Sequence, residues 1–149
     1  GLMQAANEGA ASVPGRAKSV GIRIDLPFEQ DVNAFVTEAF EHRTFFTRLH
    51  QFVLTSDAFL VAPGGIGTVL EAMMVWQLLQ VRHLPPTPFI LYGQFWRGLR
   101  SWFESEALAH GYVDAEDLHL PTLVDTVDEA ARLIGDTLAV FKARMHPPR

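Results

Sequence analysis

An apolar run that ends in a glycine-rich turn constrains the fold of this chain more than any other segment. Residues 58–62 read Ala-Phe-Leu-Val-Ala, and such a run is typical of a strand buried on both faces of a parallel sheet. Residues 63–68 read Pro-Gly-Gly-Ile-Gly-Thr, and residues 69–81 then place apolar side chains at helical spacing. A strand, a glycine-rich turn and a helix in this order predict an α/β fold, in which ligands bind beyond the carboxyl ends of the strands.

The rest of the chain continues this alternation of strands and helices. We expect further strands at 18–24, 35–43, 89–92 and 122–124, and further helices at 2–13, 45–55, 96–110 and 127–145. Segments of these lengths predict a parallel sheet with helices on both faces. A chain of 149 residues without an internal repeat or a linker is expected to form a single domain over residues 1–149.

Composition narrows the classes of function. The absence of cysteine excludes disulfides, thiolate metal sites and cysteine nucleophiles, and the six histidines show no zinc-motif spacing. We therefore expect neither a metal nor an organic cofactor. A formal net charge of -5 disfavours a broad grip on nucleic acid. No signal peptide and no apolar stretch long enough to span a bilayer is visible, so the sequence predicts a cytoplasmic protein that does not enter a membrane.

The glycine-rich turn has the composition of a phosphate-binding loop. Glycines let a ligand approach backbone N–H groups, and the following helix offers unpaired N–H groups at the positive end of its dipole. We expect a phosphoryl group to contact Gly64, Gly65, Gly67 and Thr68. Taken alone, the turn fits a loop that binds nothing equally well, because it is neither a Walker A motif nor a complete dinucleotide-binding fingerprint.

Thr68 and Glu71 have two interpretations. Thr-x-x-Glu at a helix start is the pattern of a capping box, in which each side chain accepts a hydrogen bond from the backbone N–H of the other residue. That interpretation starts the helix near Thr68, and spacing alone favours it. The other interpretation makes Glu71 a functional carboxylate beside the loop.

Three segments resemble the LOG ("Lonely Guy") family. Residues 63–71 match its signature P-G-G-x-G-T-x-x-E, residues 1–10 resemble its helix start G-L-M-x-A-A-N-x-G-A, and residues 18–30 resemble the strand and loop of its larger bacterial branch. The family comprises cytokinin-activating phosphoribohydrolases and bacterial nucleotide 5′-monophosphate nucleosidases, which were long labelled lysine decarboxylases. The resemblance covers nearly the whole chain and weakens after Gly111.

The resemblance implies a Rossmann-like fold and hydrolysis of the N-glycosidic bond of an AMP-like nucleoside 5′-monophosphate. It implies that Glu71 is the catalytic carboxylate, that Arg48 holds the substrate, and that Met3 contacts it. Residues 45–49 read Phe-Phe-Thr-Arg-Leu where the cytokinin branch has M-H-x-R-K, which favours the general nucleotidase branch. The resemblance also implies a homodimer, to whose interface Phe45, Phe46 and Trp76 could contribute.

Alternatives remain at this stage. Family members carry a βαβ unit before G-L-M, so this chain is expected to be the carboxyl-terminal portion of the domain, without its first strands. A non-catalytic nucleotide-binding protein, or an inactive truncated homologue, is therefore the second hypothesis. Lysine decarboxylation is not expected, because neither Lys18 nor Lys142 is placed to form a Schiff base. A dinucleotide oxidoreductase is disfavoured, because no acidic residue follows the turn at the usual spacing.

Overall fold

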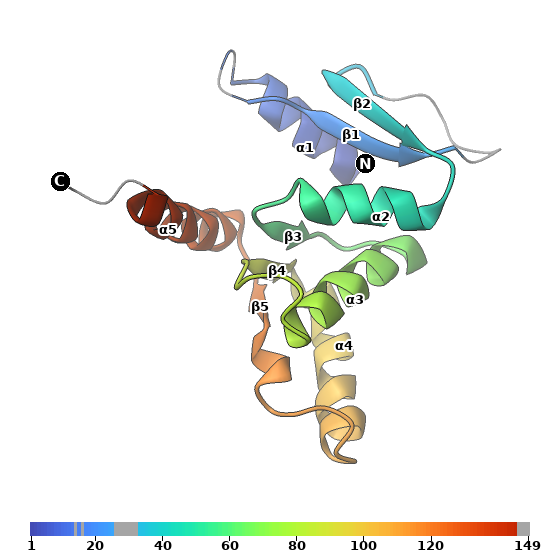
Figure 1. Cartoon of the computed structure of the whole chain (residues 1–149), viewed down its shortest axis with the longest axis vertical. Helices are drawn as coiled ribbons and strands as arrows, with labels where there is room; N and C mark the ends of the chain where they lie inside the picture. Colours follow the sequence, from blue (N-terminus) through green and yellow to red (C-terminus); the bar gives the residue numbers. More distant parts are fainter. Residues whose placement is uncertain (14, 16, 26–32, 146–149) are drawn as a thin grey trace. The chain divides into compact units, whose positions relative to one another are not determined.

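The computed structural model describes residues 1–13, 15, 17–25 and 33–145, with side chains up to residue 139 (Figure 1). Residues 26–30 of the segment that resembles the bacterial branch lie outside this range. The described chain divides into two compact units, Gly1–Ser56 and Asp57–Arg149. No helix within the described ranges combines the length and apolar character that crossing a bilayer requires.

The first unit contains two parallel strands and two helices. Its elements are α1 (Leu2–Ala11), β1 (Val20–Ile24), β2 (Glu38–His42) and α2 (Phe45–Leu54). The strands pair in parallel, with Val20 opposite Glu38 and Ile24 opposite His42. Helix α2 contacts both strands, and its amino end is capped by Thr44, whose hydroxyl accepts from the Thr47 N–H. The first unit is thus an α/β unit, as the sequence predicts.

The second unit contains three parallel strands and the glycine-rich loop. Its elements are β3 (Phe59–Val61), α3 (Ile66–Gln80), β4 (Phe89–Tyr92), the 3₁₀ helix η1 (Gln94–Trp96), α4 (Arg97–Trp102), the π-helical η2 (Phe103–Leu108), the 3₁₀ helix η3 (Asp117–His119), β5 (Pro121–Val124) and α5 (Val127–Met145). The strands lie in the order β3-β4-β5, and both pairs are parallel. The predicted α/β class with parallel strands is confirmed.

Helices cover both faces of this three-stranded sheet. Because side chains alternate along a strand, neighbouring residues of β4 face opposite sides. Ile90 packs with Val124 of β5 and Ala130 of α5 in one buried cluster. Phe89, on the other side, meets Trp76 of α3 edge-on, with ring centroids 6.4 Å apart. Strand β4 therefore lies between α5 and α3, which agrees with the predicted Rossmann-like arrangement. Leu60 of β3, which pairs with Ile90, is 49% exposed, so the prediction that run 58–62 is buried on both faces is wrong for β3.

Several predicted boundaries differ from the structure. The helix expected over 96–110 is divided into the 3₁₀, α and π segments, which begin after Gly93 with a φ of 93°. The strand expected over 35–43 begins only at Glu38, because the Asn33 side chain accepts from the Phe35 N–H and turns the chain. The first helix ends at Ala11, where Ser12 is the C-cap and its hydroxyl donates to the Gly9 carbonyl.

A capping box begins α5. Thr126 accepts from the Glu129 N–H, and the Glu129 carboxylate accepts from the N–H groups of Asp125 and Thr126. These bonds stabilise the charged carboxylate, and the first of them, from Asp125, lowers the pKa of Glu129 most. Because the folded pKa lies below the unfolded one, Glu129 stabilises the fold above its unfolded pKa and loses this contribution as pH falls through the folded pKa.

Glu129→Gln is therefore expected to weaken the acid dependence of stability. The melting temperature of the unmodified protein should fall further between neutral pH and about pH 3 than that of Glu129→Gln, because only the carboxylate binds a proton in that range. Thermal melts across this pH range measure the difference. Glu116→Gln is the matched control, because Glu116 is exposed and precedes η3 without a side-chain capping bond. Parallel curves for Glu129→Gln and the unmodified protein would contradict the cap's contribution.

Candidate active site

The amino end of α3 lies directly at the glycine-rich loop. The helix begins at Ile66, and its N-cap is Gly65, whose carbonyl accepts from the Val69 N–H at 3.0 Å. The N–H groups of Ile66, Gly67 and Thr68 therefore precede the helical hydrogen-bond ladder and point out of the helix end. The positive end of the helix dipole lies two residues closer to β3 than the sequence predicts. This geometry suits an anion placed beyond the carboxyl end of β3.

The capping-box interpretation of Thr68 and Glu71 is wrong. The N-cap is Gly65, which makes no side-chain capping bond, so Thr68 is the third residue of the helix. Glycine at 65 takes an extended conformation and lets the helix begin before the threonine. Thr68 and Glu71, three residues apart, lie on the same side of α3, and both are half-buried. Glu71 is thus a carboxylate one turn beyond the loop and not part of a cap.

The loop glycines have different reasons to be glycine. A Cβ at Gly64 would lie 2.2 Å from Oγ1 of Thr68 and 2.7 Å from its Cβ, so packing against Thr68 requires glycine there. A Cβ at Gly65 or Gly67 would meet nothing within 4 Å, and neither residue has a positive φ. Since neither packing nor backbone conformation requires these two glycines, the open space above them is available to a ligand that approaches the backbone.

The segment that follows β4 contacts the residues at the start of the glycine-rich loop. The indole Nε1–H of Trp96, which is 1% exposed, donates to the Val61 carbonyl at 3.1 Å, just before the loop. A Cβ at Gly93 would lie 3.7 Å from Cγ of Pro63, and the Gly93 N–H donates to the Val124 carbonyl. The carboxyl ends of β3, β4 and β5 are thereby joined around the loop. Gly93 and Trp96 were not predicted as site residues, although a glycine and a tryptophan directly after a buried strand are a usable signal.

Two predicted site residues belong to the first unit. Arg48 is half-buried on α2, and its Nε–H donates to the Ile22 carbonyl of β1 at 2.9 Å. This bond shows that Arg48 also fastens α2 to the strand. Met3 lies on α1 and is 81% exposed. The structure brings Gly64, Thr68 and Glu71 together in the second unit, whereas a contact of Arg48 or Met3 with the substrate stays a prediction.

The aromatic residues expected at a dimer interface differ in exposure. Phe46 of α2 is 81% exposed and Phe45 is also exposed. Trp76 is 6% exposed, and its indole donates to the Asp117 carbonyl at 2.8 Å. Trp76 is therefore part of the core of the second unit. Asp117 is half-buried, and its carboxylate accepts from the Gln80 amide.

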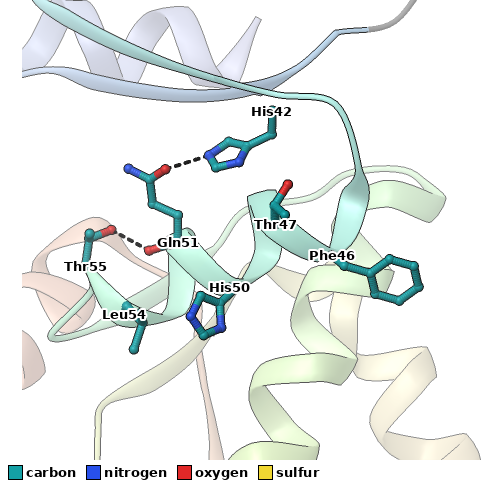
Figure 2. Close-up of a pocket in the computed structure, with 7 residues that line it drawn as sticks. All are labelled: His42, Phe46, Thr47, His50, Gln51, Leu54 and Thr55. Atoms are coloured by element: carbon teal, nitrogen blue, oxygen red, sulfur yellow. Dashed lines mark hydrogen bonds between the residues drawn. The ribbon is translucent and has the colours of Figure 1, made fainter.

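Two surface hollows of about 580 Å³ each are lined by residues outside the glycine-rich loop. Figure 2 shows the first, along α2, where the His42 imidazole points toward Gln51 and Phe46 is turned away from both. His42 Nε2 and Gln51 Oε1 are 2.6 Å apart. The second hollow lies at the amino ends of β4 and β5, where parallel sheets do not usually bind ligands. The described residues include no group of His, Cys, Asp or Glu side chains that could hold a metal ion.

Fold and loop together define a Rossmann-like α/β protein. The family model described as "Possible lysine decarboxylase" matches residues 3–134, and the chain belongs to this family, which is the LOG family. Over 79 residues the chain is 37% identical to the cytokinin riboside 5′-monophosphate phosphoribohydrolase of Mycobacterium tuberculosis. This match covers 52% of the chain and 41% of the relative, so the chain spans about two-fifths of that relative's length. The resemblance identified from the signature loop is thus confirmed, and the relative's name is that of a hydrolase.

Proposed function

We propose that the protein hydrolyses the N-glycosidic bond of nucleoside 5′-monophosphates, with release of the free base and ribose 5-phosphate. The observation that carries this proposal is the open backbone at Gly65 and Gly67, at the amino end of α3 and beyond the carboxyl end of β3. Glu71 adds a carboxylate one helical turn away. The name of the mycobacterial relative supports the reaction class.

The proposed chemistry needs a phosphate anchor and a carboxylate. The N–H groups of Gly64, Gly65, Gly67 and Thr68 hold the phosphate, and the Thr68 hydroxyl is a further donor. As the C1′–N bond breaks, positive charge develops on the sugar and the bond electrons leave with the base. Glu71 stabilises this cation or takes a proton from the water that adds to C1′, and the departing base takes up a proton. Arg48 holds the ribose or the phosphate.

Lysine decarboxylation fits the chain poorly, despite the description of the family model. That reaction uses a lysine that forms a Schiff base with pyridoxal phosphate. The two lysines of the chain are Lys18, which is exposed just before β1, and Lys142, which lies in α5. Neither lysine lies at the carboxyl end of a strand of its own unit. The glycine-rich loop, by contrast, follows the carboxyl end of β3. A homodimer and a cytoplasmic location stay predictions from the resemblance and the sequence.

Incubation of the intact protein with AMP is expected to release adenine and ribose 5-phosphate in equal amounts, whereas incubation with lysine should release no carbon dioxide. Chromatography of the base, a reducing-sugar assay and carbon dioxide capture measure the three products side by side. Binding of AMP without release of adenine would favour the non-catalytic alternative. Carbon dioxide from lysine would refute the proposal.

A further inference from the structure

An exposed aromatic ring lies just after the strand that adjoins the glycine-rich loop. Phe95 follows the turn at Gly93, where β4 ends, and is 57% exposed. A lone exposed hydrophobic side chain is common on protein surfaces and by itself indicates nothing. The position of Phe95, at the carboxyl ends of the parallel strands, is where ligands of such sheets bind.

The Phe95 ring packs against Trp96, which also supports the glycine-rich loop. It meets the Trp96 ring edge-on, with centroids 5.0 Å apart and an interplanar angle of 87°. Trp96 is buried and donates to the Val61 carbonyl, two residues before Pro63. A Cβ at Gly93 would be in ordinary contact with Pro63, at 3.7 Å from its Cγ. The backbone at Phe95 is thus tied to the end of β3 through its neighbour Trp96, and the edge-on contact with Trp96 reduces the freedom that the ring loses when a ligand covers its exposed face.

Other exposed aromatic residues of the second unit lack this placement. Trp102 ends α4 and meets Phe103 edge-on at 5.1 Å. Tyr112 is 81% exposed in the turn after η2, and its ring stacks on His110. Neither Trp102 nor Tyr112 directly follows the end of a strand. Tyr112 is therefore a matched control: it is an exposed aromatic residue that does not lie at the carboxyl end of a strand.

We propose that Phe95 determines base recognition by stacking on the base of the nucleotide whose phosphate lies on Gly65, Gly67 and Thr68. This inference rests on the proposed function and adds the group that holds the base. Phosphate and base form opposite ends of a nucleotide, so a nucleotide whose phosphate lies at the amino end of α3 places its base over a neighbouring strand end. Strand β4 is the neighbour of β3 in the sheet, and Phe95 follows its end. Stacking accepts every base, because each has a π face, so we expect a broad base range with larger gains for purines.

The test compares a ligand that has a base with one that lacks it. Phe95→Ala is expected to raise the KM for AMP by about 5-fold to about 140-fold, the range for loss of one base–aromatic stack. The inhibition constant of ribose 5-phosphate should not change, because that product has no base. Phe95→Tyr should retain the KM of the unmodified protein, and Tyr112→Ala should alter neither constant.

The outcomes separate this inference from the proposed function. An unchanged KM for AMP in Phe95→Ala, or an equal loss for AMP and ribose 5-phosphate, overturns the stacking role. Should Phe95→Ala fail to fold in thermal melts, Phe95→Leu keeps apolar volume without the ring, and the same two criteria apply to it. Failure of the unmodified protein to hydrolyse AMP overturns the proposed function instead. The dissociation constants of AMP and ribose 5-phosphate in the same variants then decide the stacking role.

Discussion

Glu71→Gln is expected to lower the turnover of AMP by roughly 10²–10⁴-fold, the usual range for loss of a general acid–base group. The change removes the negative charge that would stabilise the sugar cation or activate water. Glutamine keeps the size of the side chain, and Glu71 does not cap α3, whose N-cap is Gly65. Affinity for AMP and the melting temperature are therefore expected to change little. Steady-state kinetics, equilibrium binding and thermal melts measure the three quantities.

The control for this prediction is a glutamate that does cap a helix. Glu129→Gln removes a charge from the capping box of α5, so it should alter the acid dependence of stability and leave turnover at neutral pH unchanged. A Glu71→Gln protein with the turnover of the unmodified enzyme would remove Glu71 from the chemistry. A Glu71→Gln protein that unfolds at neutral pH would show that the carboxylate is structural.

Gly64→Ala is expected to lower kcat/KM for AMP by about 10²-fold, the loss that a displacement of about 1 Å in an aligned site can cause. The new Cβ would lie 2.2 Å from Oγ1, 2.7 Å from Cβ and 3.0 Å from Cγ2 of Thr68. Rotation of the Thr68 side chain cannot relieve this overlap, because its Cβ does not move on rotation. The backbone of the loop or of the first helical turn must shift, and the N–H groups that would hold phosphate shift with it.

Gly98→Ala is the matched control for Gly64→Ala. Gly98 lies within α4, and a Cβ there would meet nothing within 4 Å. Alanine in a helix is favoured over glycine by roughly 0.5–1 kcal/mol, so the melting temperature should rise slightly and kcat/KM should not change. Overpacking typically costs about 1–3 kcal/mol, so Gly64→Ala should lower the melting temperature. Unaltered kcat/KM in Gly64→Ala would show that the loop does not position the substrate.

Local sequence patterns predicted the strands around the candidate site. The apolar runs at 58–62 and 89–92 contain β3 and β4. Burial on both faces is confirmed for β4, where Phe89, Ile90 and Leu91 are buried, but not for β3, where Leu60 is 49% exposed. The resemblance carried by the glycine signature placed the chain in the right family. These features depend on residues close together in the sequence, which is why they could be read without a structure.

The two Thr-x-x-Glu patterns show why the capping box predicted at Thr68 and Glu71 was wrong. At Thr126 the chain leaves β5 and the capping box forms, whereas at Thr68 the preceding Gly65 accepts the N-cap conformation and the helix begins earlier. The Thr-x-x-Glu pattern is the same in both places, and what differs is that Gly65, three residues before Thr68, already serves as the N-cap of α3. Local patterns likewise could not reveal that Trp96 supports the loop, because its bond to Val61 joins residues 35 positions apart.

The Trp96–Val61 bond also bears on the order in which the protein is built. During synthesis Val61, which lies just before the glycine-rich loop, emerges 35 residues before the indole that donates to its carbonyl. Glycine-rich backbone has much conformational entropy to lose, so the loop is expected to take its final shape only when β4 and Trp96 close against β3. A nascent chain must therefore extend at least to Trp96, past β4, before it can capture a ligand on this loop. A ligand that binds the finished loop in turn stabilises the whole unit through mass action.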